Sequence, residues 1–168
     1  MKYLNIHLIN IIMKKERKYI GEMKNGLKDG KGILYYDKDN EYERKRYEGD
    51  FRNDKFEGKG IIYWNEGDRY EGDFKNDKME GKGIFYWNNG ERYEGDEKKG
   101  LMEGKGIYYY KNGDRYEGDW KNNKKEGNGI HFYNNGDREM GDYVGGRKTG
   151  RHVTLENDGK IKSKIYSH

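Results

Sequence analysis

Four glutamates stand at equal spacing in the sequence and could do acid–base chemistry: Glu48, Glu71, Glu94 and Glu117. Paired carboxylates act as general acid and base when different surroundings push their pKa values apart. Here each glutamate follows a tyrosine and precedes Gly-Asp, so one environment is copied four times. An active site instead needs a unique set of groups in perturbed surroundings. We therefore expect exposed ladders of charge at these positions and a protein that is not an enzyme.

The remaining chemical motifs also fail to form a site. His7, His131, His152 and His168 show no metal-ligand spacing, and the chain has no cysteine that could supply a thiolate. The recurring Gly-Lys-Gly triplets lack the spacing of a phosphate-binding loop. We expect no metal site and no cofactor. The absence of cysteine fits a reducing compartment.

A repeat of 23 residues organises the chain, because Tyr47, Tyr70, Tyr93 and Tyr116 each open the sequence Tyr-Glu-Gly-Asp. An earlier unit is five residues longer, and the last unit is degenerate. The predicted repeat region is 19–161, divided into units 19–46, 47–69, 70–92, 93–115, 116–138 and 139–161. Residues 1–18 form an N-terminal segment, which is either a half repeat or capping strand, or a frayed helix. Residues 162–168 are predicted to be a C-terminal tail.

Each unit carries two short runs of strand-forming residues, such as "YEGDF" and "GIFYW" in the unit 70–92. Asn-Gly or Glu-Gly links successive units and is typical of hairpin turns. Only 31% of the residues are hydrophobic, yet 15% are aromatic, so a thin layer of rings must replace a thick core. The chain contains no proline that would interrupt a strand ladder. The sequence predicts an all-β fold, an elongated single-layer antiparallel meander of successive β-hairpins.

A strand register follows from matching the side-chain faces. A four-residue loop within the unit and a three-residue loop between units place Phe74 between Gly60 and Gly81, in a flat slot that a ring can fill. The same arrangement is expected around Phe51 and Trp120. On the other face the register predicts cross-strand ion pairs within each hairpin: Asp50–Lys59, Asp73–Lys82 and Asp96–Lys105, with Asp119 opposite Asn128 and therefore without a lysine.

The pattern Tyr-Glu-Gly-acidic-aromatic, Gly-Lys-Gly, aromatic residues and an Asn-Gly or Asp-Gly turn resembles the MORN repeat (membrane occupation and recognition nexus). The resemblance covers about residues 19–161 and is weakest in 139–161. It implies a single-layer sheet of hairpins and a non-enzymatic scaffold, located in the cytoplasm or at the cytoskeleton or the inner face of a membrane. The chain departs from the pattern at Glu97, where an aromatic residue is expected, and at Asn128, where lysine is usual.

The aromatic residues are expected to share one face of the sheet and to form a groove for protein partners, which include a second copy of the chain. The alternative is that the rings only pack on each other and on glycine. The predicted groove residues are Tyr47, Phe51, Trp64, Tyr70, Phe74, Trp87, Tyr93, Tyr110, Tyr116 and Trp120.

Basic residues near the two ends of the chain support a second hypothesis, binding to anionic phospholipids of the phosphoinositide type. These residues are Lys14, Lys15, Arg17, Lys18, Arg44, Lys45, Arg46, Arg147, Lys148 and Arg151. The four central units carry 17 Lys and Arg against 20 Asp and Glu, which disfavours a whole sheet lying on an acidic membrane and disfavours nucleic-acid binding. A third hypothesis is a regulatory region of a larger enzyme such as a phosphatidylinositol phosphate kinase.

The N-terminal stretch of residues 1–18 is not expected to be a signal peptide. Its apolar run is interrupted by Asn5, His7 and Asn10, and lysines follow where small residues would be needed. The run is also too short to span a bilayer.

Overall fold

A computed structural model describes residues 18–38 and 41–167, which form β-strands joined by turns. These residues divide into two larger structural units, which are distinct from the 23-residue repeats. The first unit ends at Asp77 and the second begins at Lys78. The first unit holds β1 (Tyr19–Lys24), β2 (Leu27–Tyr35), β3 (Arg44–Arg52), β4 (Lys55–Trp64) and β5 (Arg69–Lys75). The second holds β6 (Lys78–Tyr86), β7 (Arg92–Lys98), β8 (Leu101–Tyr109), β9 (Arg115–Lys121), β10 (Lys124–Phe132), β11 (Arg138–Val144), β12 (Arg147–Leu155) and β13 (Ile161–Tyr166).

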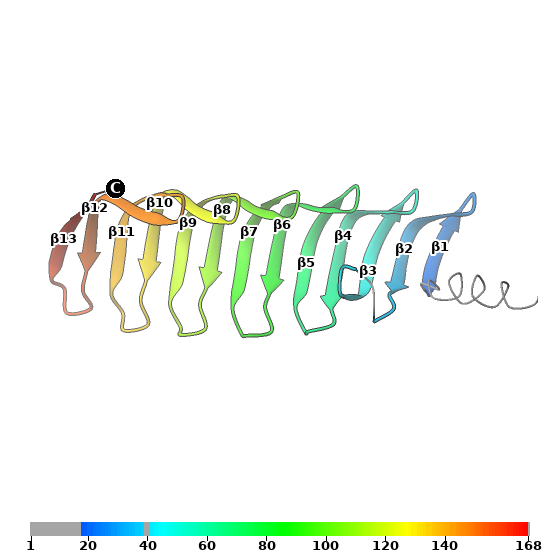
Figure 1. Ribbon diagram of the computed structural model, residues 1–168, viewed down its shortest axis with the longest axis horizontal. Coiled ribbons are helices and arrows are strands. Elements are labelled where there is room, and N and C mark those ends of the chain that lie inside the picture. The colour runs from blue at the N-terminus through cyan, green and yellow to red at the C-terminus, as the bar shows by residue number, and fades with distance from the viewer. Residues whose placement is uncertain (1–17, 39–40, 168) are drawn as a thin grey trace, which may run out of the picture. The chain divides into compact units, whose positions relative to one another are not determined.

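Within each unit the strands that are neighbours in the sequence are also neighbours in the sheet (Figure 1), and they pair antiparallel. The predicted all-β meander of successive hairpins is confirmed. The described residues contain no helix long and apolar enough to cross a membrane. Most of the segment predicted to be a tail, 162–168, belongs to β13, which pairs with β12. The prediction of a half repeat or capping strand at 1–18 lies outside the described residues, apart from Lys18.

The hairpin inside each repeat closes with a two-residue turn, not with the predicted four-residue loop. Between β3 and β4 the turn consists of Asn53 and Asp54, whose φ angles are 49° and 66°. Two successive residues in the left-handed region make a type I′ turn, which matches the twist of the two strands. Asn and Asp adopt this region at lower cost than other residues with a side chain. Asn53 and Asp54 therefore close the hairpin two residues sooner than predicted.

The tight turn changes the register near it. Phe51 on β3 pairs with Phe56 on β4. The predicted four-residue loop would have placed Phe51 opposite Gly58 of the same strand. A bulge on β4, in which Gly58 has a φ of 66°, then restores the pairing of Gly49 with Gly60. Such a bulge adds residues to one strand without turning the later side chains to the other face.

The register between repeats also differs from the prediction. Gly58, not Gly60, pairs with Phe74, and Ile62 pairs with Tyr70. The predicted three-residue loop was too short, because the last pair before the turn is Tyr63 with Arg69. The shift is two residues, so each side chain still lies on the predicted face.

The ring that covers each glycine pair is the tyrosine of the same strand. Over the pair Gly49 and Gly60 lies Tyr47, and a Cβ atom on either glycine would overlap its hydroxyl group. The Tyr47 hydroxyl donates a hydrogen bond to the Asp50 carbonyl oxygen at 2.9 Å. Glycine therefore serves as a packing device, as predicted. The ring that it accommodates is the buried tyrosine, and not Phe51 or Trp120 as the predicted register had it. Trp120 has Gly104 on one side and Lys125 on the other.

The buried rings, together with two aliphatic side chains of the first unit, form the core of each unit. In the first unit the core holds Leu34, Tyr47, Phe51, Phe56, Ile62, Tyr70 and Phe74, and in the second it includes Tyr93, Tyr116, Trp120 and Tyr143. Tyr47 contacts Phe51 edge-to-face and stacks on Phe56, with ring centroids 5.1 and 3.7 Å apart. We call the side of each unit that carries these rings the aromatic face, and the opposite side the charged face.

Candidate functional site

The charged face satisfies its own ions through two sets of pairs. One set joins a lysine of one repeat to an aspartate of the next: Lys31–Asp50, Lys59–Asp73, Lys82–Asp96 and Lys105–Asp119. The predicted pairs within the hairpin, such as Asp50 with Lys59, are therefore wrong. The extra residues of the bulge move the lysine toward the following repeat, where Asp119 also finds a lysine.

The second set pairs arginine with glutamate two residues later. Arg92 lies near Glu94 and also 4.1 Å above the Tyr109 ring, and Arg115 lies near Glu117 and 3.9 Å above the Phe132 ring. The repeated glutamates are thus partners in charge ladders, as the copied sequence indicated. Exposed pairs of this kind contribute little stability.

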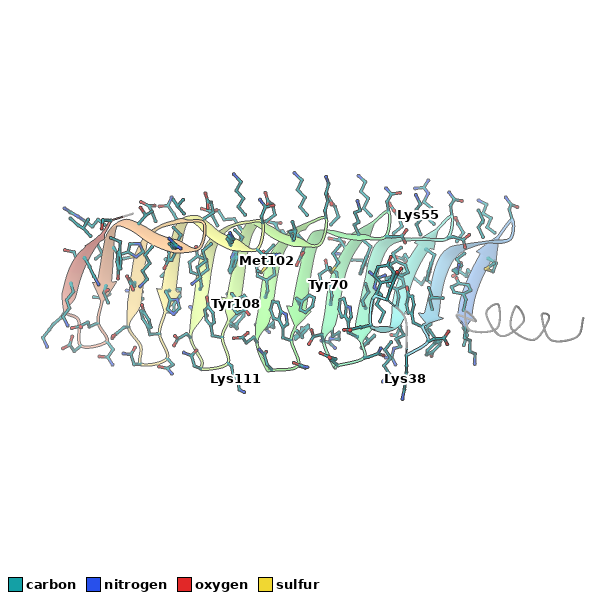
Figure 2. The ribbon with its side chains drawn as sticks, viewed as in Figure 1. Lys38, Lys55, Tyr70, Met102, Tyr108 and Lys111 are labelled. Carbon is teal, nitrogen blue, oxygen red and sulfur yellow. The ribbon has the colours of Figure 1, made fainter. Side chains whose placement is uncertain are left out.

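The aromatic face of the second unit exposes a continuous series of rings. Six half-buried side chains from β6, β8 and β10 and the turns after them follow one another at centroid distances of 4.5–5.5 Å. We call them the ring ladder: Phe85, Trp87, Tyr108, Tyr110, His131 and Tyr133. Figure 2 shows Tyr108 on the side of the turns between repeats, near Lys111, and Met102 nearer the turns inside the repeats.

Carboxylates at the turns between repeats hold the polar ends of these rings. Tyr108 donates to Glu91 Oε2 at 2.8 Å, and His131 Nε2 lies 3.2 Å from Asp114 Oδ2. Burial raises the pKa of Tyr110 to about 12, so this phenol stays neutral at physiological pH. The ladder is therefore ordered before any partner arrives, which reduces the entropy lost on binding.

Only three of the predicted groove residues are partly exposed on the aromatic face of their own unit. Trp64, Trp87 and Tyr110 are half-buried. The other seven form the core and are at most 6% exposed: Tyr47, Phe51, Tyr70, Phe74, Tyr93, Tyr116 and Trp120. Trp120 Nε1 also donates to the Gly106 carbonyl oxygen at 3.1 Å, so this indole is fixed inside the unit.

Four ladder residues were missed by the sequence analysis: Phe85, Tyr108, His131 and Tyr133. The signal was present, since Phe85, Tyr108 and His131 recur at the repeat spacing two residues before Trp87, Tyr110 and Tyr133. Residues two apart on a strand share a face. The rings two residues before Trp87, Tyr110 and Tyr133 therefore lie on the same face as these residues.

Glu97 is the one acidic residue at a position where the neighbouring repeats place Phe74 and Trp120. Its side chain is only 6% exposed, and Oε2 makes no hydrogen bond. Burial raises the pKa of Glu97 to about 7. A buried carboxylate without a cation or donor is costly, so this group is a strong candidate for contact with a partner.

Lys125 lies on the same face among tyrosine rings. Its ammonium group is 4.3 Å from the Tyr116 centroid, 5.3 Å from that of Tyr110 and 5.4 Å from that of Tyr143. Within the described part of the chain no carboxylate forms an ion pair with it. Burial, together with the nearby Lys148, lowers the pKa of Lys125 to about 8.

The last repeat exchanges the tyrosine and the glycine for a buried polar pair. Glu139 stands at the tyrosine position and His152 at the second glycine position. The His152 ring covers Gly141, and its Nε2 donates to the Asp142 carbonyl oxygen at 2.9 Å. This is the carbonyl position that Tyr47 binds in its own repeat. The covering ring thus comes from the opposite strand.

Glu139 is held by several groups. Lys148 Nζ lies 2.5 Å and the Tyr133 hydroxyl 2.6 Å from Oε2, and His152 Nδ1 lies 3.1 Å from Oε1. Burial alone would raise the pKa of Glu139, but the hydrogen bonds from Lys148 and Tyr133 outweigh it, so the pKa is lowered. This cluster is internally paired and has the character of a structural cap on the last repeat.

The predicted lipid-binding residues have different environments. Lys18, Lys45, Arg147 and Arg151 are exposed. Arg46 is engaged with Glu48 and Tyr63, Arg44 lies over the Tyr42 ring, and Lys148 is bound to Glu139. Lys14, Lys15 and Arg17 lie outside the described residues. Anionic lipid binding stays a prediction. Among the described residues no three His, Asp or Glu side chains are grouped in a way that would hold a metal ion.

Comparison with known families identifies the repeat. A family model described as "MORN repeat" matches residues 19–41, 47–69, 70–92, 93–115 and 116–138. The chain belongs to the MORN-repeat family. The match excludes the segment from Glu139 onward, where the tyrosine and glycine of the MORN pattern are exchanged for Glu139 and His152. No curated protein matches the chain by sequence.

Solved structures that resemble this MORN-repeat chain include the following two. One is the SAS-4 (dCPAP) TCP domain of Drosophila melanogaster in complex with a proline-rich motif of Ana2 (dSTIL), at 14% identity and a TM-score of 0.48, covering 89% of this chain and 90% of that one. The other is the wild-type TCP10 domain of Danio rerio CPAP in complex with a STIL peptide, at 11% identity and a TM-score of 0.28, covering 88% of this chain and 84% of that one.

Proposed function

We propose that this MORN-repeat protein is a non-enzymatic scaffold whose aromatic face binds a segment of another protein. The ring ladder is the observation that carries the proposal. Six half-buried rings in continuous contact present a large apolar surface with few rotatable bonds. Aromatic residues of this kind commonly dominate protein–protein binding energy.

The contrast between the two faces supports this choice of surface. On the charged face the lysines and arginines already pair with carboxylates, as in Lys105–Asp119 and Arg115–Glu117. A partner there would have to break these pairs and desolvate both ions. On the aromatic face a partner would cover rings that are already ordered and only partly in contact with water.

A peptide selection tests the proposal. Random linear peptides of about twelve residues, long enough to cross several strands at roughly 4.8 Å per strand, are displayed on phage and selected on the full chain. We expect enriched peptides whose affinity falls at least about tenfold, or 1.4 kcal/mol, in Trp87→Ala and Tyr108→Ala.

The control is Tyr109→Ala, because Tyr109 is adjacent to Tyr108 but lies on the charged face beside Arg92. Circular dichroism and thermal unfolding establish that each variant is folded. Binding that survives loss of Trp87 and Tyr108 but is lost in the Tyr109 variant would contradict the proposal, as would a selection that enriches no peptide.

A further inference from the structure

The aromatic face of the second unit carries two ionisable side chains that form no ion pair within the described residues. Glu97 Oε2 is buried and makes no hydrogen bond. Lys125 contacts tyrosine rings but forms no ion pair within the described residues. The other carboxylates at this face are engaged, since Glu91 accepts from Tyr108 and Glu139 from Lys148. The two unpaired groups therefore need an explanation that the repeat itself does not supply.

The two groups lie on the aromatic face, three strands apart. Glu97 on β7 pairs with Met102 on β8, and Trp120 on β9 pairs with Lys125 on β10. Three steps of about 4.8 Å separate β7 from β10, so the two groups stand on the order of 14 Å apart. An extended chain covers this distance in about four residues at roughly 3.3 Å per residue.

We propose that the aromatic face binds an extended segment of another protein that places an arginine or lysine against Glu97 and an aspartate or glutamate against Lys125. This inference rests on the proposed function and specifies the chemistry of the partner. The ring ladder supplies apolar contact area, and the two ions fix the direction and register of the segment. Opposite charges brought together in a desolvated site contribute mainly to specificity.

The repeats themselves indicate what the two positions would contain if only stability mattered. Phe51, Phe74 and Trp120 occupy the position of Glu97, and Phe56 and Met102 occupy that of Lys125. An apolar residue at either position fits the same backbone and avoids a buried charge. Replacing the two ions by these residues should therefore keep the fold while removing the charge recognition.

The test uses the peptides selected on the full chain. We expect the enriched sequences to share a basic residue about four positions from an acidic one. Replacing the basic residue of a synthetic peptide by norleucine should weaken binding about tenfold on the unmodified chain and less than about twofold on Glu97→Gln. Replacing the acidic residue should show the same dependence on Lys125→Met. Fluorescence anisotropy with labelled peptide measures each affinity.

Matched controls come from the charged face of the second unit. Glu94→Gln on β7 and Lys105→Met on β8 remove charges that are paired with Arg92 and Asp119. These variants should leave the preference for a basic and an acidic residue unchanged. Glu97→Phe is a second variant, expected to fold because Phe51 and Phe74 occupy the corresponding position, and it too should abolish the preference for the basic residue.

The outcomes separate this inference from the proposed function. Peptides that need Trp87 and Tyr108 for binding but show no preference for charged residues would overturn the inference alone. The same holds if the preference for a basic residue is unchanged on Glu97→Gln. A selection that enriches no peptide would overturn both. A chain that forms a dimer by light scattering, and becomes monomeric in Glu97→Gln or Lys125→Met, would show that a second copy supplies the opposite charges and would overturn the assignment to another protein.

Discussion

At the scale of single residues, Glu97 shows the sharpest conflict between stability and the repeat pattern. The side chain replaces a ring, lies among Tyr93, Met102 and Trp120, and has a buried oxygen without a partner. A carboxyl group in such a place favours the neutral form, because its charge loses hydration and gains no cation. Its effect on folding should therefore depend on pH.

Glu97→Gln should reveal this dependence directly. The pKa of Glu97 is raised from 4.5 to about 7 in the folded protein, so the folded state binds the proton more tightly than the unfolded chain. The stability of the unmodified protein should therefore fall, relative to the variant, as the pH rises from about 4.5 to about 7. We expect a difference near zero at low pH that reaches about 3 kcal/mol at pH 8, measured by urea unfolding. A difference that does not change with pH would contradict the burial of an unpaired carboxylate.

The packing of tyrosine on glycine gives a second prediction at this scale. Gly106→Ala would place a Cβ atom against the Tyr93 ring, which is completely buried and cannot move aside. We expect a loss of about 3 kcal/mol or more in the free energy of unfolding. The control is Gly90→Ala, where no heavy atom lies nearby and only the positive φ of 92° opposes the substitution. It should cost about 1–2 kcal/mol, and equal losses at the two sites would count against the packing argument.

At the scale of the elements, the last hairpin shows that the repeat can be built in two ways. A ring must cover the glycine and a donor must reach the aspartate carbonyl, and in the hairpin of β11 and β12 both come from His152 rather than from a tyrosine. Glu139 then occupies the vacated position and is neutralised by Lys148. The two substitutions are therefore expected to be coupled.

A double-mutant cycle on Glu139→Tyr and His152→Gly tests this coupling. Glu139→Tyr alone forces two rings into one place, and His152→Gly alone leaves Gly141 uncovered, so each should cost about 2–3 kcal/mol. The double variant restores the arrangement of the other repeats, and it should be at least about 1 kcal/mol more stable than either single variant. Additive losses, measured by thermal unfolding at one pH, would show that the exchange is not a coupled one.

At the scale of the whole molecule, the sequence predicted the meander, the two faces and the packing role of glycine, because each follows from a pattern repeated at constant phase. The exact register did not follow, since the turn at Asn53 and Asp54 and the bulge at Gly58 compensate each other. The exposed rings were also hard to predict. Trp120 and Phe85 each lie one residue from the end of their strand, yet Trp120 is buried and Phe85 is half-buried, so alternation along a strand does not reveal which ring is covered.

Deleting one complete repeat should leave the second unit folded. Removal of residues 93–115 joins Arg92 to Tyr116, which recreates the sequence junction between Arg92 and Tyr93. Because each hairpin contacts its neighbours in sequence, stability is nearly a sum over repeats and their interfaces. We expect an unchanged β-type circular dichroism spectrum per residue and a lower melting temperature. A spectrum of unfolded chain would contradict this picture of local contacts.

The three tryptophans allow the most direct test of the proposed binding surface. In a proton–nitrogen NMR spectrum of the full chain, a peptide selected as above should shift the indole signal of Trp87 and the backbone amide signals of Tyr108 and Tyr110. The Trp120 indole, bound to the Gly106 carbonyl oxygen, should stay protected from solvent exchange before and after the addition. The account predicts that the amides flanking Glu97 shift as well, while the side-chain signals of Arg92 and Arg115 on the charged face stay in place. Shifts confined to those arginines, with Trp87 unaffected, would contradict it.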